Sequence, residues 1–318
     1  MTFVYCTGLM FSVYHRPPGR VSWQSLTPRK RNGYDALVAT SSSSVRISPT
    51  AHYTGYTWLQ HGLSHPAFAT PTGRFLYRAL VPANKAMAAA GQGTLDGFLL
   101  ARHHLIDALL RRAIESGQVS QVIEVACGLS PRGYRFAQAH GDAITYVEAD
   151  LPPMAAKKRE LLARAGAGAP THRVVEIDAT AETGEHSIDA IAAGLDPARG
   201  TAIITEGLLN YFDPASVAGM WGRFARALGR FPHGLYLADL HLGEHARPIE
   251  RVFAGLLGVF VRGRIHFHYP DAPAATVGLS GAGFGRPALR APEEHQDLIG
   301  PVHVPSARAV RIVEAWLR

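Results

Sequence analysis

The chain has 318 residues, of which 47% are hydrophobic and 18% are charged, and its formal net charge is +7. This length predicts a large buried core, and the chain has no run of about 18 apolar residues that would cross a membrane. The basic residues are spread out and mostly arginine, which argues against a nucleic-acid-binding surface. The charge either indicates a preference for acidic ligands or reflects a high-GC coding sequence that favours arginine and alanine. The two cysteines, Cys6 and Cys127, cannot form a disulfide framework and fit a cytoplasmic protein.

Residues 1–48 contain Pro17-Pro18-Gly19 and a serine run, with no sustained helical or strand period. We expect a poorly ordered N-terminal arm there, and we consider it a hypothesis that this arm precedes the functional start of the protein. The composition then changes to SPTAHYTGYTWLQHGLSHPAF, which is dense in aromatic residues and histidines. Such a segment suits a cap over a flat organic ligand, although its histidines could instead satisfy polar groups of a helical core.

Residues 98–110, FLLARHHLIDALL, predict an amphipathic helix with Phe98, Leu105 and Leu109 on its apolar stripe. Arg102 falls on the same stripe, where an unpaired cation would be costly. We therefore expect Arg102 to meet an anion in a polar pocket, with a partly exposed position at the helix edge as the alternative. Residues 49–118 together form the predicted helical cap and its cofactor-contacting helix.

Residues 121–136, QVIEVACGLSPRGYRF, predict a strand, a tight turn and the start of a helix. In open α/β sheets such a turn places backbone N–H groups beside a nucleotide-like cofactor. The signal is incomplete, because Ala126 stands where the first glycine of a G-x-G-x-x-G motif would be.

Strand-like and helix-like segments alternate from there to about residue 260. The expected strands are 122–125, 143–148, 172–178, 201–205 and 235–240, with weaker ones at 265–268 and near Leu289. Helices are expected at 131–140, 152–165, 186–193, from Pro214 onward, and around Ile249 to Phe260. Short connections between alternating strands and helices predict a mostly parallel sheet with both faces covered over residues 119–318.

Acidic residues follow four successive strands of this predicted sheet. They are Glu148 or Asp150, then Asp178, Glu206 and Asp239. Side chains at the carboxyl ends of parallel strands share one edge of the sheet, where ligands bind. Glu148 and Asp150 are both spaced suitably to accept hydrogen bonds from a ribose, and Asp150 could instead cap the following helix. Together with Arg102 and the glycine turn, this set suits S-adenosylmethionine, while a nicotinamide cofactor stays open.

The segments SPTAHYTGYTW, VIEVACGLSPRGYRF, YVEADLPPMAAKKR, HRVVEIDA and ITEGLLNYF resemble the leucine carboxyl methyltransferase-like family, within it the O-methyltransferases of the tetracenomycin polyketide type. The resemblance implies a class I methyltransferase fold, a Rossmann-like sheet of seven mostly parallel strands with the last one antiparallel and an N-terminal helical cap. It also implies S-adenosyl-L-methionine as cofactor. We expect no metal site.

The same resemblance assigns cofactor roles to five residues. Arg102 would bind the methionine carboxylate, Gly128 would lie under the methionine moiety, Asp150 would hold the ribose, Asp178 would lie near the adenine and Glu206 would contact the methionyl end. The family prefers Asp150 to Glu148. The chain departs from the family at Ala126-Cys127-Gly128, where many relatives have G-x-G.

The expected reaction is O-methylation of a small aromatic, polyketide-type metabolite by in-line displacement. A carboxylate acceptor is already ionised and needs no general base, and Arg132 or Arg74 would steer it. For a phenolic acceptor a base becomes useful, and His61, His65 and His241 are the candidates. The alternatives are an NAD(P)-dependent oxidoreductase and a non-catalytic S-adenosylmethionine-binding protein. A homodimer is possible.

Overall fold

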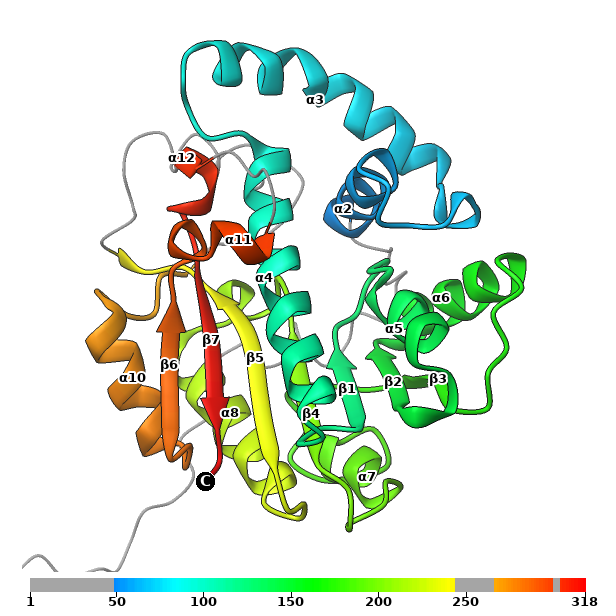
Figure 1. The fold of residues 1–318 in the computed structure, drawn as a ribbon, viewed down its shortest axis with the longest axis vertical. Helices are drawn as coiled ribbons and strands as arrows, with labels where there is room; N and C mark the ends of the chain where they lie inside the picture. The colour runs from blue at the N-terminus through cyan, green and yellow to red at the C-terminus, as the bar shows by residue number, and fades with distance from the viewer. Residues whose placement is uncertain (1–48, 244–265, 300–303) are drawn as a thin grey trace, which may run out of the picture. The chain divides into compact units, whose positions relative to one another are not determined.

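The computed structural model describes residues 49–243, 266–299 and 304–318 (Figure 1). These residues belong to one compact unit, residues 46–318. The predicted N-terminal arm and the predicted helix from Ile249 to Phe260 lie outside the described residues, and the three-part division of the chain stays a prediction. Within the described ranges, no helix is both long and apolar enough to cross a membrane.

The described residues build one seven-stranded sheet in the order β3-β2-β1-β4-β5-β7-β6. The strands are β1 (Gln121–Val125), β2 (Thr145–Asp150), β3 (His172–Glu176), β4 (Thr201–Thr205), β5 (Gly234–Leu240), β6 (Arg286–Arg290) and β7 (Arg311–Trp316). The pairs among β1 to β5 are parallel, whereas β7 runs antiparallel to both β5 and β6. This confirms the predicted class I methyltransferase sheet with an antiparallel last strand.

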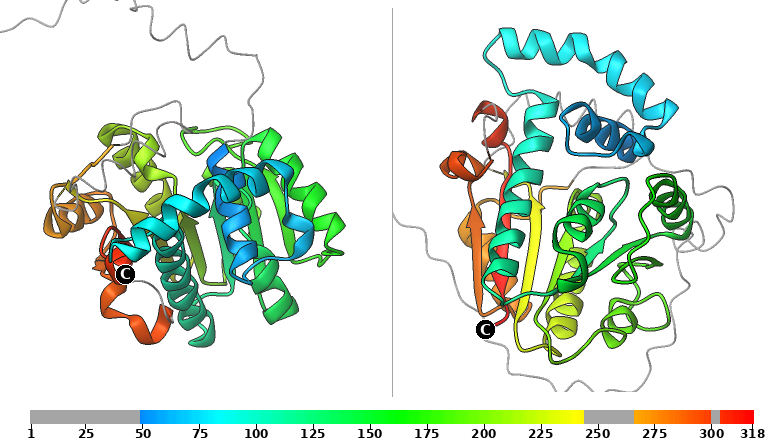
Figure 2. Two further views of the ribbon diagram at one scale, coloured as in Figure 1. Left: turned by 90° about the horizontal axis from the view of Figure 1, so that it is seen from above. Right: turned by 45° about the vertical axis from the view of Figure 1, so that its right-hand side comes forward.

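Helices cover both faces of the sheet. They are α4 (Leu95–Glu115), α5 (Arg132–His140), α6 (Pro152–Arg164), α7 (Ile188–Ala193), α8 (Pro214–Leu228), α10 (Ala272–Gly281), α11 (Gln296–Ile299) and α12 (Val304–Ala307). Ile123 of β1 belongs to the core with α7, α8 and α10, while its neighbour Val122 belongs to the core with α4, α5 and α11. Figure 2 shows α4 and α8 on opposite faces, as expected from side chains that alternate along a strand.

The helical cap consists of α2 (Pro49–Gln60), the 3₁₀ turn η1 (Pro66–Phe68) and α3 (Pro71–Ala89), and it lies beyond the carboxyl ends of the parallel strands (Figure 1). Asp96, in the first turn of α4, joins the three helices. It accepts hydrogen bonds from Tyr53 of α2 at 2.8 Å and from Tyr77 and Asn84 of α3 at 3.0 and 3.1 Å. The cap is therefore tied to the helix that carries Arg102.

Two local predictions were wrong. Residues 266–268 form no strand, because their polar groups bond to the loop after β4: His266 N–H donates to the carbonyl of Asn210 at 2.9 Å. The missing strand is β7, whose Ile312 and Val313 are fully buried. Asp150 is not the N-cap of α6 either, since Leu151 occupies that position and Asp150 is the last residue of β2.

Candidate functional site

The turn after β1 holds two residues in the left-handed region, Ala126 with φ 55° and Gly128 with φ 52°. The N–H of Gly128 donates to Oδ2 of Asp150 at 2.7 Å, and the N–H of Leu151 donates to Oδ1 at 2.7 Å. These bonds fix the Asp150 carboxylate beside the turn. Burial raises the pKa of Asp150 above its usual range, even though both N–H donors favour the ionised form.

Glu148 and Asp150 are distinguished by their surroundings. Glu148 is fully buried, forms an ion pair with Lys158 and contacts Nε2 of His172 at 2.6 Å. Its carboxylate is thus fully occupied by protein partners in the interior, on the face of the sheet covered by α5. Asp150, at the carboxyl end of β2, is the acid that a ligand at the sheet edge can reach, which agrees with the spacing and family arguments for the ribose.

Arg102 does meet anions in the interior, as its place on the apolar stripe of α4 predicts. Its Nε donates to Oε1 of Glu206 at 3.0 Å and its Nη1 donates to Oδ2 of Asp239 at 2.9 Å. Burial alone would lower the pKa of Arg102, but the two carboxylates outweigh that effect and raise it. Nη2 has no hydrogen-bond partner in the part of the chain that the structure describes, so one donor nitrogen is left for a ligand.

Asp239 also binds the loop after β4, because its Oδ1 accepts the N–H of Gly207 at 2.6 Å. Gly207 has φ 69°, and a Cβ atom there would lie 3.1 Å from Nη2 of Arg102. Asp239 thereby sets the position of both the arginine and the adjacent backbone. The sequence marked Asp239 as an acid at a strand end but gave it no role.

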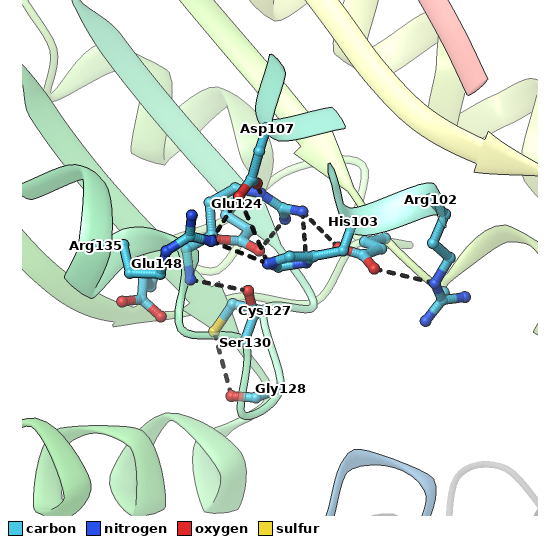
Figure 3. Close-up of polar contacts among 12 residues, drawn as sticks. Arg102, His103, Asp107, Glu124, Cys127, Gly128, Ser130, Arg135 and Glu148 are labelled. Atoms are coloured by element: carbon cyan, nitrogen blue, oxygen red, sulfur yellow. Dashed lines mark hydrogen bonds and ion pairs between the residues drawn. The ribbon is translucent and has the colours of Figure 1, made fainter. Parts of the chain in front are cut away.

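Arg132 lies at the centre of a buried ionic cluster and is 0% exposed. Its Nε, Nη1 and Nη2 reach Asp107, Glu124 and Glu206 at 2.6, 2.7 and 2.6 Å respectively. In Figure 3, Asp107 of α4 and Glu124 of β1 point toward one another beside His103, with Arg102 at the edge of the group. The expectation that Arg132 steers an acceptor conflicts with this burial, since all three guanidinium nitrogens already have carboxylate partners.

Glu206 links this cluster to Arg102. Its Oε2 contacts Nη2 of Arg132 at 2.6 Å and Nδ1 of His103 at 2.9 Å, while its Oε1 accepts from Arg102. Burial would raise the pKa of Glu206, but His103 and Arg132 dominate and hold it well below its usual range. Glu206 is therefore ionised, and both of its oxygens are engaged by the protein.

The three candidate bases lie apart from one another. His61 contacts Oδ2 of Asp96 at 3.4 Å in the cap, and His65 accepts the N–H of Ala67 at 3.2 Å as the N-cap of η1. His241 follows β5, with Nε2 3.9 Å from Oδ2 of Asp239. Of the three, His241 is thus the one that shares a neighbour with Arg102.

Asp178 follows β3 at the same edge of the sheet. Its Oδ1 accepts from the N–H and the hydroxyl of Thr180 at 2.8 and 2.6 Å, and the residue is exposed. A carboxylate oxygen has two lone pairs, so Asp178 and Asp150 can each accept a further hydrogen bond. The chemistry of the set fits S-adenosylmethionine: a guanidinium with one donor nitrogen that is unpaired among the described residues, a glycine turn and two carboxylates that accept hydrogen bonds.

Three members of the buried cluster, His103, Asp107 and Glu124, were not recognised as site residues from the sequence. Only Glu124 carried a signal, since its charge interrupts a strand that is otherwise mostly apolar, whereas a charge such as Asp107 is ordinary on the polar side of an amphipathic helix. A charge inside an apolar segment requires a partner, as the argument for Arg102 had assumed.

The sequence and the fold were compared with those of known proteins. A sequence model of the leucine carboxyl methyltransferase family matches residues 65–224, half of the chain. A "Putative S-adenosyl-L-methionine-dependent methyltransferase" of Mycolicibacterium paratuberculosis is 38% identical over 115 residues, which are 36% of this chain and 34% of the relative. A relative of the same description from Mycobacterium ulcerans is 35% identical over 128 residues, 40% of each chain. The matched segment thus spans well under half of these relatives.

Two crystal structures share the fold. A DUF574 family protein from Streptomyces avermitilis has a TM-score of 0.58 at 15% identity, covering 84% of this chain and 96% of its own. A "putative methyltransferase" from Thermobifida fusca has a TM-score of 0.59 at 15% identity, covering 85% and 96%. At this identity the likeness concerns the arrangement of the sheet and helices.

Proposed function

This chain belongs to the leucine carboxyl methyltransferase family, and from that premise we propose that it is an S-adenosyl-L-methionine-dependent O-methyltransferase. The observation that carries the proposal is the joint placement of Arg102, Gly128 and Asp150 at the carboxyl edge of the sheet. We place its activity in the cytoplasm and its acceptor among small aromatic, polyketide-type metabolites.

Arg102, Asp150 and Asp178 would bind the cofactor from three directions. Nη2 of Arg102 would bind the methionine carboxylate, Asp150 would accept hydrogen bonds from the ribose hydroxyls, and Asp178 would accept from the adenine amino group. Gly128 leaves room under the methionine moiety, because a Cβ there would meet only Ala51 within 4 Å, at 3.6 Å. Glu206 would act on the methionyl end indirectly, because its Oε1 holds Arg102 in place.

The bound cofactor supplies an electrophilic methyl group on a sulfonium. The protein would then orient the acceptor oxygen in line with that group and exclude water. In favourable intramolecular models, such orientation lowers the activation free energy by as much as ~7–11 kcal/mol. A carboxylate acceptor is ionised at neutral pH, so this route needs no base. The exposed Arg74 of α3 is the remaining candidate to steer it.

A phenolic acceptor would need a base, and the geometry favours His241 for that role. Its Nδ1 lies 3.2 Å from the carbonyl oxygen of Ala309, which favours the tautomer with the proton on Nδ1. Its Nε2 lies 3.9 Å from Oδ2 of Asp239, the carboxylate that also bonds Arg102, so His241 is the candidate base beside the proposed cofactor site. His65 is less suitable, because its Nδ1 already accepts a backbone N–H.

Calorimetric titration tests the cofactor assignment. S-adenosylmethionine should bind the wild-type protein, and Arg102→Ala or Asp150→Ala should abolish that binding. Arg112→Ala is the matched control, because Arg112 also lies on α4 but pairs with Glu314 at 2.9 Å. Binding of NADH without binding of S-adenosylmethionine would overturn the proposal in favour of an oxidoreductase.

A further inference from the structure

The buried cluster around Arg132 connects three parts of the fold to one guanidinium. Asp107 comes from α4, Glu124 from β1 and Glu206 from the end of β4, and each is bonded to a different nitrogen of Arg132. Tyr146 of β2 adds a hydrogen bond to Glu124 at 2.7 Å. Because Arg132 is 0% exposed, it cannot touch a ligand itself, and any effect on binding has to pass through its partners.

One of these partners leads directly to the proposed cofactor site. Glu206 accepts from Arg132 with Oε2 and from Arg102 with Oε1, so the two guanidiniums are joined through a single carboxylate. The side chain of Glu206 is 5% exposed, which leaves water little access to replace either bond. The direction of the Glu206 carboxylate consequently depends on Arg132 together with His103, and the direction of Arg102 depends on Glu206 together with Asp239.

We infer that Arg132 is a positioning residue, which holds Glu206 and thereby aims Nη2 of Arg102 at the carboxylate of the cofactor. The inference rests on the proposed function. It requires an arginine at this position, because a planar guanidinium presents donors in several fixed directions, whereas a lysine ammonium acts as a point charge. A lysine would keep the charge of the cluster but could not bond all three carboxylates in this geometry.

The probe for this inference is a pair of cofactors that differ only in the carboxylate. Wild-type protein should bind S-adenosylmethionine more tightly than decarboxylated S-adenosylmethionine, because only the former engages Arg102. In Arg132→Lys this preference should fall roughly tenfold, in line with the coupling energies of residues that share one network. If Arg132 had only a structural role, the substitution would weaken the binding of both ligands equally and leave the preference unchanged.

The matched control is Arg135→Lys. Arg135 is on the same helix and bonds Oδ2 of Asp107 at 2.6 Å, but it makes no ion pair with Glu206 among the described residues. We expect Arg135→Lys to keep the wild-type preference for the carboxylate. If Arg132→Lys does not fold, Glu124→Gln takes its place, since it keeps the side-chain shape and removes the carboxylate charge that contacts Nη1 of Arg132.

For Glu124→Gln we expect the preference to fall at least about threefold, a smaller effect because Arg132 itself remains. The inference is overturned if the folded Arg132 or Glu124 variant keeps the wild-type preference, or if the wild-type protein binds S-adenosylmethionine with no preference for the carboxylate. Absence of any S-adenosylmethionine binding by the wild-type protein would instead refute the proposed function.

Discussion

Gly207 is the position where one methyl group should perturb the cofactor site most selectively. A Cβ atom there would lie 3.1 Å from Nη2 and 3.3 Å from Nη1 of Arg102, and the backbone has φ 69°. The left-handed conformation costs a non-glycine residue roughly 1–2 kcal/mol. The close contact adds a displacement of Arg102 by a few tenths of an ångström, away from the direction that Glu206 and Asp239 impose.

Gly166→Ala separates these two effects. Gly166 follows Ala165, the C-cap of α6, and has φ 68°, nearly the same as Gly207, but a Cβ there would meet nothing within 4 Å. Left-handed strain of about 1–2 kcal/mol, partly offset by about 0.4–1 kcal/mol from the less free unfolded chain, should lower the unfolding free energy of both variants by about 0–1.6 kcal/mol in urea titrations. Only Gly207→Ala should also weaken S-adenosylmethionine binding, by roughly tenfold in calorimetry. Equal cofactor affinity in the two variants would refute the claim that Gly207 leaves room for a cofactor-binding Arg102.

Two further predictions concern stability. Ala126 has φ 55°, so Ala126→Gly should relieve about 1–2 kcal/mol of strain and lose about 0.4–1 kcal/mol to the freer unfolded chain. The net gain in unfolding free energy is therefore about 0–1.6 kcal/mol in urea titrations, and a loss of stability would contradict the strained turn. For Asp107, burial raises the pKa, but His103, Arg132 and Arg135 dominate and lower it to about 2. This depressed pKa contributes about 2 kcal/mol of stability above pH 4, which is lost as the pH falls toward 2. Asp107→Asn should flatten the pH dependence of unfolding between pH 4 and 2, and an unchanged slope would count against the cluster.

Patterns local in sequence predicted much of the fold. Alternating strands and helices gave the sheet and most of its helices, and β4 (Thr201–Thr205) lies where expected. The β7 strand was missed although Ile312 and Val313 favour a strand. The pattern of strands is weaker in the C-terminal residues from about 264 onward, where several segments are similarly apolar. Residues 266–268 alternate like a strand, yet tertiary bonds to the loop after β4 decide their conformation.

The candidate site was predictable where a residue violated its local pattern. A cation on the apolar stripe of α4 implied a buried partner, and Arg102 has two. The role of Arg132 was not predictable in this way, because its partners Asp107, Glu124 and Glu206 lie on separate elements that only the folded sheet brings together. Spacing alone left Glu148 and Asp150 equivalent, and burial against Lys158 separates them.

Methyl transfer itself is the direct test of the proposed activity. The full chain would be incubated with S-adenosylmethionine that has an isotope-labelled methyl group and with a panel of aromatic carboxylic acids and phenols. The labelled products would be identified by mass spectrometry. We expect a labelled methyl ester from at least one acid, no product with Arg102→Ala, and persistence of the ester with His241→Ala. A labelled ether that disappears with His241→Ala would assign a phenolic acceptor instead. A protein that binds S-adenosylmethionine but labels no acceptor across the panel would contradict the methyltransferase assignment and favour a non-catalytic binding protein.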